Sequence, residues 1–113
     1  MHLKEAAELV PGDVVAWLAA ARKPDPWGQI NTGHVMIVDG SPRERSPGEW
    51  VVPVIDSSLG HGGSDGRRYP EVTGLGRGTI VLVFEGGSLV GYRSGESPRA
   101  TLRRTTVALG RIL

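Results

Sequence analysis

A histidine and an aspartate lie at the ends of two apolar segments, where a hydrolase would keep a general base and the group that orients it. His34 precedes the apolar run of residues 35–38, and Asp56 closes a second run at residues 50–56. An imidazole exchanges its proton near neutral pH, and a neighbouring carboxylate fixes which ring nitrogen carries that proton. The chain has no cysteine and no obvious nucleophile. The sequence therefore indicates a candidate site without its attacking atom.

Two antiparallel strands are predicted to carry these side chains. Residues 33–39 and 50–56 are short and rich in valine and isoleucine, and a turn-rich stretch with proline and glycine at residues 40–48 separates them. Short β-branched runs bounded by such turn residues are typical of neighbouring strands. We therefore expect the two segments to pair.

The expected register decides whether the two side chains meet. With Asp39 opposite Trp50, paired residue numbers sum to about 89 or 90, which places His34 across from Asp56 or the residue before it. The Cβ atoms of such a pair lie about 4.5–5.5 Å apart, close enough for imidazole and carboxylate to touch. A slip of one residue would turn one of them to the other face. The pattern is also open to another interpretation, in which Asp56 caps a turn with Ser57 and Ser58 and His34 is satisfied by backbone groups.

Length and composition predict one small domain, residues 1–113. A formal net charge of +1 argues against binding to nucleic acid or to an anionic membrane. The absence of cysteine removes disulfides, thiolate metal sites and thiol catalysis from the chain as written. No segment has the apolar core of a signal peptide or the roughly 20 apolar residues of a membrane span. We therefore expect a cytoplasmic product as written, although a longer product with an export signal is an alternative.

The pattern of apolar runs predicts an α+β fold that is mostly β. The expected elements are a short N-terminal helix and six strands, at residues 2–10, 13–18, 33–39, 50–56, 78–84, 88–93 and 104–113. Residues 79–84 are almost continuously apolar, which indicates a central strand buried on both faces. With 17 glycines and 8 prolines between the elements, we expect a strongly bent antiparallel sheet or a small six-stranded barrel.

Two motifs resemble the NlpC/P60 family of papain-like cysteine peptidases and amidases. These are Pro11-Gly12-Asp13 at the entry to the first strand and Gly33-His34-Val35 at the start of the second. Several later segments, among them Gly91-Tyr92-Arg93, resemble a bacterial branch of that family in the same order along the chain. The resemblance covers the chain from about Leu9 to its end. It implies a papain-like core.

The resemblance also implies roles for the two site residues. His34 matches the family's catalytic base and Asp56 matches the residue that orients it, whereas the family's nucleophilic cysteine lies on a helix before the Pro-Gly-Asp strand. Here ten residues precede Pro11 and none is cysteine. A truncated sequence, a non-catalytic descendant and a site completed by another polypeptide are three explanations. Ser57 and Ser58 are poor substitutes, because a strand-end serine lacks a positioned base and oxyanion site.

Three further residues are candidates for contacting substrate. Trp27 lies in a loop just before the histidine strand, and His61 and Arg67 lie in a glycine-rich loop at residues 57–77. A long loop in a compact domain is often functional, and an arginine there suits a substrate carboxylate. His61 and Asp65 alone are too few ligands for a structural metal site. We expect neither metal nor cofactor.

The implied function is a cell-wall-type peptidase or amidase domain acting on peptide or amide bonds of peptidoglycan-like substrates. Without its cysteine we expect this chain to be inactive as written. One alternative is a non-catalytic module that binds peptide or glycan. Another is a scaffold completed by a partner or by homo-oligomerisation over the face that the missing helix leaves bare, because exposed apolar faces mark interaction sites.

Overall fold

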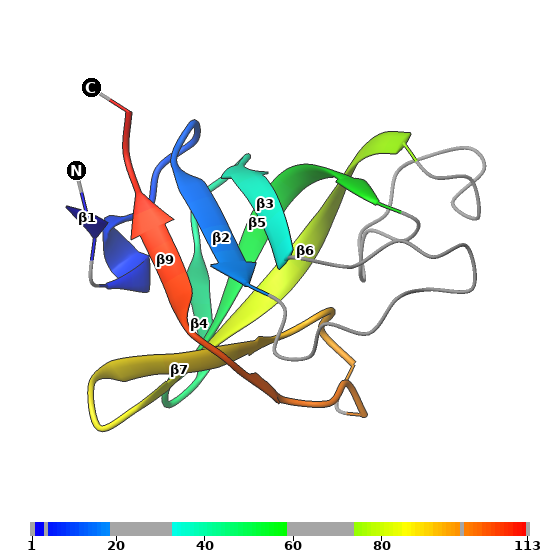
Figure 1. The fold of residues 1–113 in the computed structure, drawn as a ribbon. Coiled ribbons are helices and arrows are strands. Elements are labelled where there is room, and N and C mark those ends of the chain that lie inside the picture. The colour runs from blue at the N-terminus through cyan, green and yellow to red at the C-terminus, as the bar shows by residue number, and fades with distance from the viewer. Residues whose placement is uncertain (1, 4, 19–32, 59–73, 98, 113) are drawn as a thin grey trace.

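The structure is a computed structural model that describes residues 2–3, 5–18, 33–58, 74–97 and 99–112. Its described residues form one antiparallel sheet and a short 3-10 helix, η1, at Ala6–Glu8 (Figure 1). The strands are β1 (His2–Leu3), β2 (Val14–Leu18), β3 (Gly33–Val38), β4 (Arg43–Ser46), β5 (Glu49–Ser58), β6 (Gly74–Glu85), β7 (Ser88–Arg93), β8 (Arg103–Arg104) and β9 (Val107–Gly110). Eight of them follow the order β1-β9-β2-β3-β5-β6-β7-β8, and β4 pairs with β5 beside this path.

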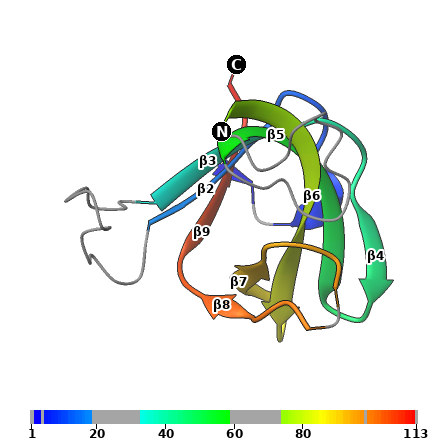
Figure 2. The ribbon, with the colours of Figure 1, turned by 90° about the vertical axis from the view of Figure 1, so that its right-hand side faces the viewer.

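The sheet curls strongly around a single interior, so that β2, β3 and β9 lie on one side and β5 and β6 on the other (Figure 2). The mostly-β, bent antiparallel fold is confirmed. Hydrogen bonding does not close the sheet into a barrel within the described residues, because β1 and β8 are its two ends. The expected number of six strands is too low: nine are present in the described part, since β1, β4 and β8 are short segments that periodicity does not reveal.

The predicted N-terminal helix at residues 2–10 is wrong. His2 and Leu3 pair with Gly110 and Leu109 of β9 instead, and only Ala6–Glu8 adopt a single helical turn. A helix of two turns is marginal, because nucleation is unfavourable and only a few hydrogen bonds offset it. Pairing with β9 gives the backbone groups of His2 and Leu3 hydrogen-bond partners without that nucleation step.

The β5–β6 ribbon is the longest element of the sheet, with ten residue pairs from Glu49–Val83 to Ser58–Gly74. The inner face of β6 places Ile80 and Leu82 in the main core, and its outer face places Val81 and Val83 in a second cluster. Leu102, which follows β7, covers that outer cluster. The prediction of a central strand buried on both faces is therefore confirmed.

The register between β3 and β5 differs from the predicted one. Ile37 pairs with Ile55, and the Asp39 N–H donates to the Pro53 carbonyl at 2.8 Å, so Asp39 does not face Trp50. The reason is β4, which occupies part of the supposed turn region and forms a hairpin with the start of β5. Compared with direct pairing of His34 and Asp56, the observed register is shifted by two residues. An even shift keeps both side chains on the same face.

The Pro-Gly-Asp motif forms the turn that leads into β2. Gly12 has φ +98°, a conformation that favours glycine, and its N–H donates to the Val38 carbonyl at 2.9 Å. The Val38 N–H in turn donates to the Asp13 carbonyl at 2.8 Å. These two hydrogen bonds attach the turn to the end of β3, the strand that carries His34.

The side chain of Asp13 joins the two ends of the chain, which lie close together (Figure 1). Arg111 donates from Nε to Oδ1 at 2.8 Å and from Nη2 to Oδ2 at 2.9 Å, and Oδ2 also accepts the Val10 N–H at 2.9 Å. Asp13 is almost fully buried. The hydrogen bonds from Arg111 lower the pKa of Asp13 below its ordinary value, against the opposing effect of burial. None of the described helical segments is long and apolar enough to cross a membrane.

Replacing Asp13 tests how much its hydrogen bonds with Arg111 and Val10 stabilise the fold. Asp13→Ala removes the carboxylate that accepts from the Val10 N–H and from the Arg111 guanidinium, and we expect it to lower the free energy of unfolding by about 2 kcal/mol at pH 7. Because the pKa of Asp13 is lowered on folding, its ionisation stabilises the fold above the ordinary pKa of 3.8 and stops doing so as the pH falls through the lowered value. Urea denaturation from pH 7 to pH 2 should show the two proteins converging at the acid end. A difference that stays constant with pH would contradict this account. Asp13→Asn keeps an oxygen that can accept the Val10 N–H, so it should be less destabilised than Asp13→Ala.

Candidate functional site

His34 and Asp56 are in direct contact on the inner face of the sheet. His34 Nε2 lies against Asp56 Oδ2, joining β3 to β5. The side chain of Asp56 is only 3% exposed, whereas that of His34 is 25% exposed. Where the Asp56 carboxylate is the acceptor in this contact, Nε2 carries the proton and Nδ1 keeps a lone pair.

The backbone explains how the two side chains meet despite the shifted register. The described ladder between β3 and β5 consists of the pairs at Ile37 and Val38, so it ends before His34. Extending it along both strands makes Asp56 the diagonal neighbour of His34, within reach of long side chains. On its other side Asp56 pairs with Gly76 of β6, which places no side chain beside the carboxylate. Asp56 lies within β5, so the alternative interpretation as a turn cap is wrong.

The histidine ring contacts one member of an aromatic stack. Trp17 of β2 pairs directly with His34, and their ring centroids are 5.6 Å apart at an angle of 50°. Trp17 also stacks on Tyr92 of β7, with centroids 3.8 Å apart and planes 21° apart. Strands β2 and β7 are not neighbours in the sheet, so this stack forms across the interior of the curl. Burial raises the pKa of Tyr92, and its phenol therefore stays protonated at neutral pH.

Neither Trp17 nor Tyr92 is among the site residues predicted from the sequence. The signal that would have found Trp17 is the alternation of β2, which puts Trp17 on the same face as the buried Val15. The contact with Tyr92 has no comparable signal, because it depends on the curl of the whole sheet.

An open cavity of about 560 Å³ lies beside His34. It is lined by Ala16, Trp17, Gly33, His34, Val35, Thr106 and Ala108. Because Ala16, Val35 and Ala108 alternate with Trp17, His34 and Val107 along paired strands, their side chains lie on the outer face of the sheet, whereas the imidazole lies on the inner face. The volume of the cavity lies within the range of small-molecule sites. The imidazole is partly exposed, so the pair can present a ring nitrogen, oriented by a buried carboxylate, to a ligand.

The three other predicted site residues, Trp27, His61 and Arg67, lie outside the described residues, as does Asp65. Among the residues that the structure does describe, no group of three or more histidine, aspartate or glutamate side chains could hold a metal ion.

Comparisons of the chain with protein-family models, with curated proteins and with solved structures find no match. The resemblance to the NlpC/P60 family therefore remains an interpretation of the motif residues.

The state of the imidazole tests the geometry of the pair. We expect ¹⁵N NMR of the neutral His34 ring to show the proton on Nε2, because Asp56 accepts it there. Asp56→Asn keeps an oxygen acceptor and should retain this tautomer, whereas Asp56→Leu removes the acceptor at similar volume and should give a mixture. An unchanged tautomer in Asp56→Leu would show that some other group orients the ring.

Proposed function

We propose that this chain carries the base and the orienting residue of an NlpC/P60-like site on a papain-like core, and that the site recognises amide bonds in peptidoglycan-like peptides. The observation that supports the proposal is the contact between His34 and Asp56 on the inner face of the bent sheet. The two residues were selected by their sequence positions alone, and they come from different strands.

The chemistry of this site follows from the orientation of the ring. With Nε2 held by Asp56, the Nδ1 lone pair is placed to take a proton from a nucleophile and to return it to a leaving amine. The chain has no cysteine to serve as the nucleophile. The chain alone therefore binds the amide without cleaving it, unless another polypeptide supplies a thiol.

A second candidate function is a scaffold completed by a partner or by a second copy of the chain. Val35 and Ile37, on the outer face of β3, are 60% and 40% exposed. Adjacent exposed apolar side chains of this kind mark interaction surfaces. Sedimentation and binding of an apolar dye together test the scaffold function. A chain that stays monomeric and binds no apolar dye would contradict it.

Incubation with cell-wall muropeptides tests the first proposal. We expect saturable binding by calorimetry and no release of new amino groups. His34→Ala should weaken the binding about tenfold, as the loss of one hydrogen bond worth about 1.4 kcal/mol would do. Thr101→Ala, an exposed substitution outside the cavity, is the matched control and should bind as the unmodified chain does. Cleavage that survives His34→Ala, or binding that ignores it, would overturn the assigned roles.

A further inference from the structure

A second cavity lies at the opposite end of the curled sheet from the histidine. Its central residue, Trp50, precedes Asp56 by six residues on β5, a distance of about 20 Å along an extended strand. The cavity encloses about 480 Å³, and three segments that are distant in the sequence surround it: η1, the β4–β5 hairpin and the β6–β7 hairpin. Its lining residues are Glu5, Ala6, Ala7, Glu44, Pro47, Gly48, Trp50, Phe84, Gly86 and Gly87.

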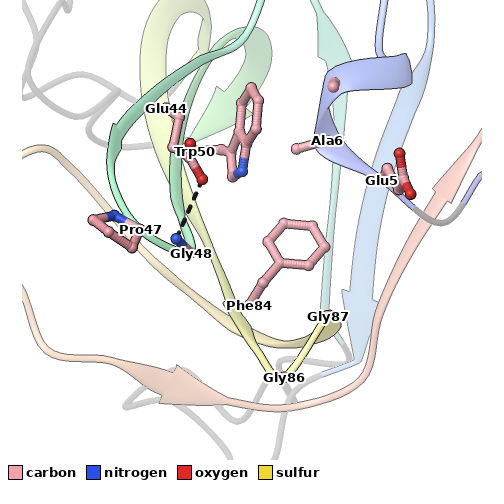
Figure 3. Close-up of a pocket in the computed structure, with 10 residues that line it drawn as sticks. Glu5, Ala6, Glu44, Pro47, Gly48, Trp50, Phe84, Gly86 and Gly87 are labelled. Atoms are coloured by element: carbon pink, nitrogen blue, oxygen red, sulfur yellow. Dashed lines mark hydrogen bonds between the residues drawn. The ribbon is translucent and has the colours of Figure 1, made fainter.

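Two aromatic rings form the apolar floor of this cavity. Trp50 and Phe84 are half-buried, pack against the main core, and turn their rings toward the same space (Figure 3). The Phe84 N–H donates to the Gly48 carbonyl at 2.7 Å, which holds the two hairpins together. Gly48 has φ +82°, and a Cβ there would lie 2.5 Å from the Phe84 carbonyl oxygen, so a larger residue would disrupt this wall.

The rim of the cavity is acidic. Glu44 comes from β4, and its Oε2 accepts the Gly48 N–H at 3.3 Å, so the carboxylate lies across the turn beside Trp50 (Figure 3). Glu5 contributes a second carboxylate from the side of η1. No lysine or arginine is among the ten lining residues, which are all described. The cavity thus combines two aromatic rings with two carboxylates among its lining residues.

We propose that this cavity binds a lysine side chain of a peptide, independently of the His34 site. A lysine side chain has a long apolar stem and a compact ammonium head. The stem matches the Trp50 and Phe84 rings, and the head matches the Glu44 carboxylate beside Trp50, while Glu5 adds negative charge on the side of η1. An ammonium over an aromatic ring gains further attraction from the ring's negative face. A neutral apolar side chain would contact the two aromatic rings but would make no ion pair with the carboxylates.

The test is an NMR titration of the full chain with two capped tripeptides, glycyl-lysyl-glycine and its norleucine counterpart. The indole N–H of Trp50 reports binding. We expect saturable binding of the lysine peptide at millimolar concentrations, at least fivefold weaker binding of the norleucine peptide, and weaker lysine binding as salt is added. The double substitution Glu5→Gln with Glu44→Gln should weaken lysine binding at least fivefold. Both side chains are exposed, and glutamine keeps an oxygen that can accept the Gly48 N–H, so we expect the double variant to fold; its NMR spectrum checks this.

Two variants serve as controls. Glu85→Gln removes an exposed carboxylate next to the β6–β7 turn that is paired with Arg104 and does not line the cavity. It should bind the lysine peptide as the unmodified chain does, and so should His34→Ala. Equal affinity for the two tripeptides, unchanged binding by the double variant, or shifts that centre on His34 instead of Trp50 would each overturn the proposal. None of these results bears on muropeptide binding at His34.

Discussion

The rest of the fold depends on the antiparallel pairing of β5 with β6. These strands pair over ten residues, and the ribbon supplies the centres of both apolar clusters. Apolar burial on two faces fixes its register, because a slip of one residue would exchange the clusters. Strands β3 and β4 both pair with the remaining edge of β5, at opposite ends. The ribbon therefore sets the position of both cavities, with Asp56 near one end of β5 and Trp50 near the other.

Two side-chain contacts between segments that are not neighbours in the sequence stabilise the curl of the sheet. The Trp17–Tyr92 stack joins β2 to β7 across the interior, and the Asp13–Arg111 pair fastens the turn before β2 to the end of the chain. Both contacts act on the strands around His34, whose ring packs against Trp17. An imidazole held by packing on one side and by a carboxylate on another is oriented before any ligand arrives, which reduces the ordering cost of binding.

The sequence predicted the strands at residues 33–39, 50–56, 78–84 and 88–93 because local apolar runs and turn residues report strand formation directly. The prediction that His34 and Asp56 share one face also holds, because the observed register differs from their direct pairing by two residues, and an even shift leaves the face unchanged. The predicted helix at residues 2–10 and the missed β4 share one cause: the strands that form in these segments, His2–Leu3 and Arg43–Ser46, are too short to show a strand period in the sequence. β1 forms by pairing with β9 near the other end of the chain, and β4 forms by a local hairpin with β5. The contact of Tyr92 with Trp17 could not be predicted, because it depends on the curl of the whole sheet.

Two buried carboxylates of this fold have different partners, and the difference bears on function. Asp13 is paired with an arginine, a permanent cation, and the pair lowers the pKa of Asp13 and supports the fold. Asp56 is almost equally buried, and one of its contacts is with His34, a residue type that can gain or lose a proton near neutral pH. An arginine cannot do so in a protein, so the Asp13–Arg111 pair keeps its charges over the whole neutral range. The two buried carboxylates are therefore suited to different tasks: Asp13 to holding the fold, and Asp56 to orienting a partly exposed imidazole.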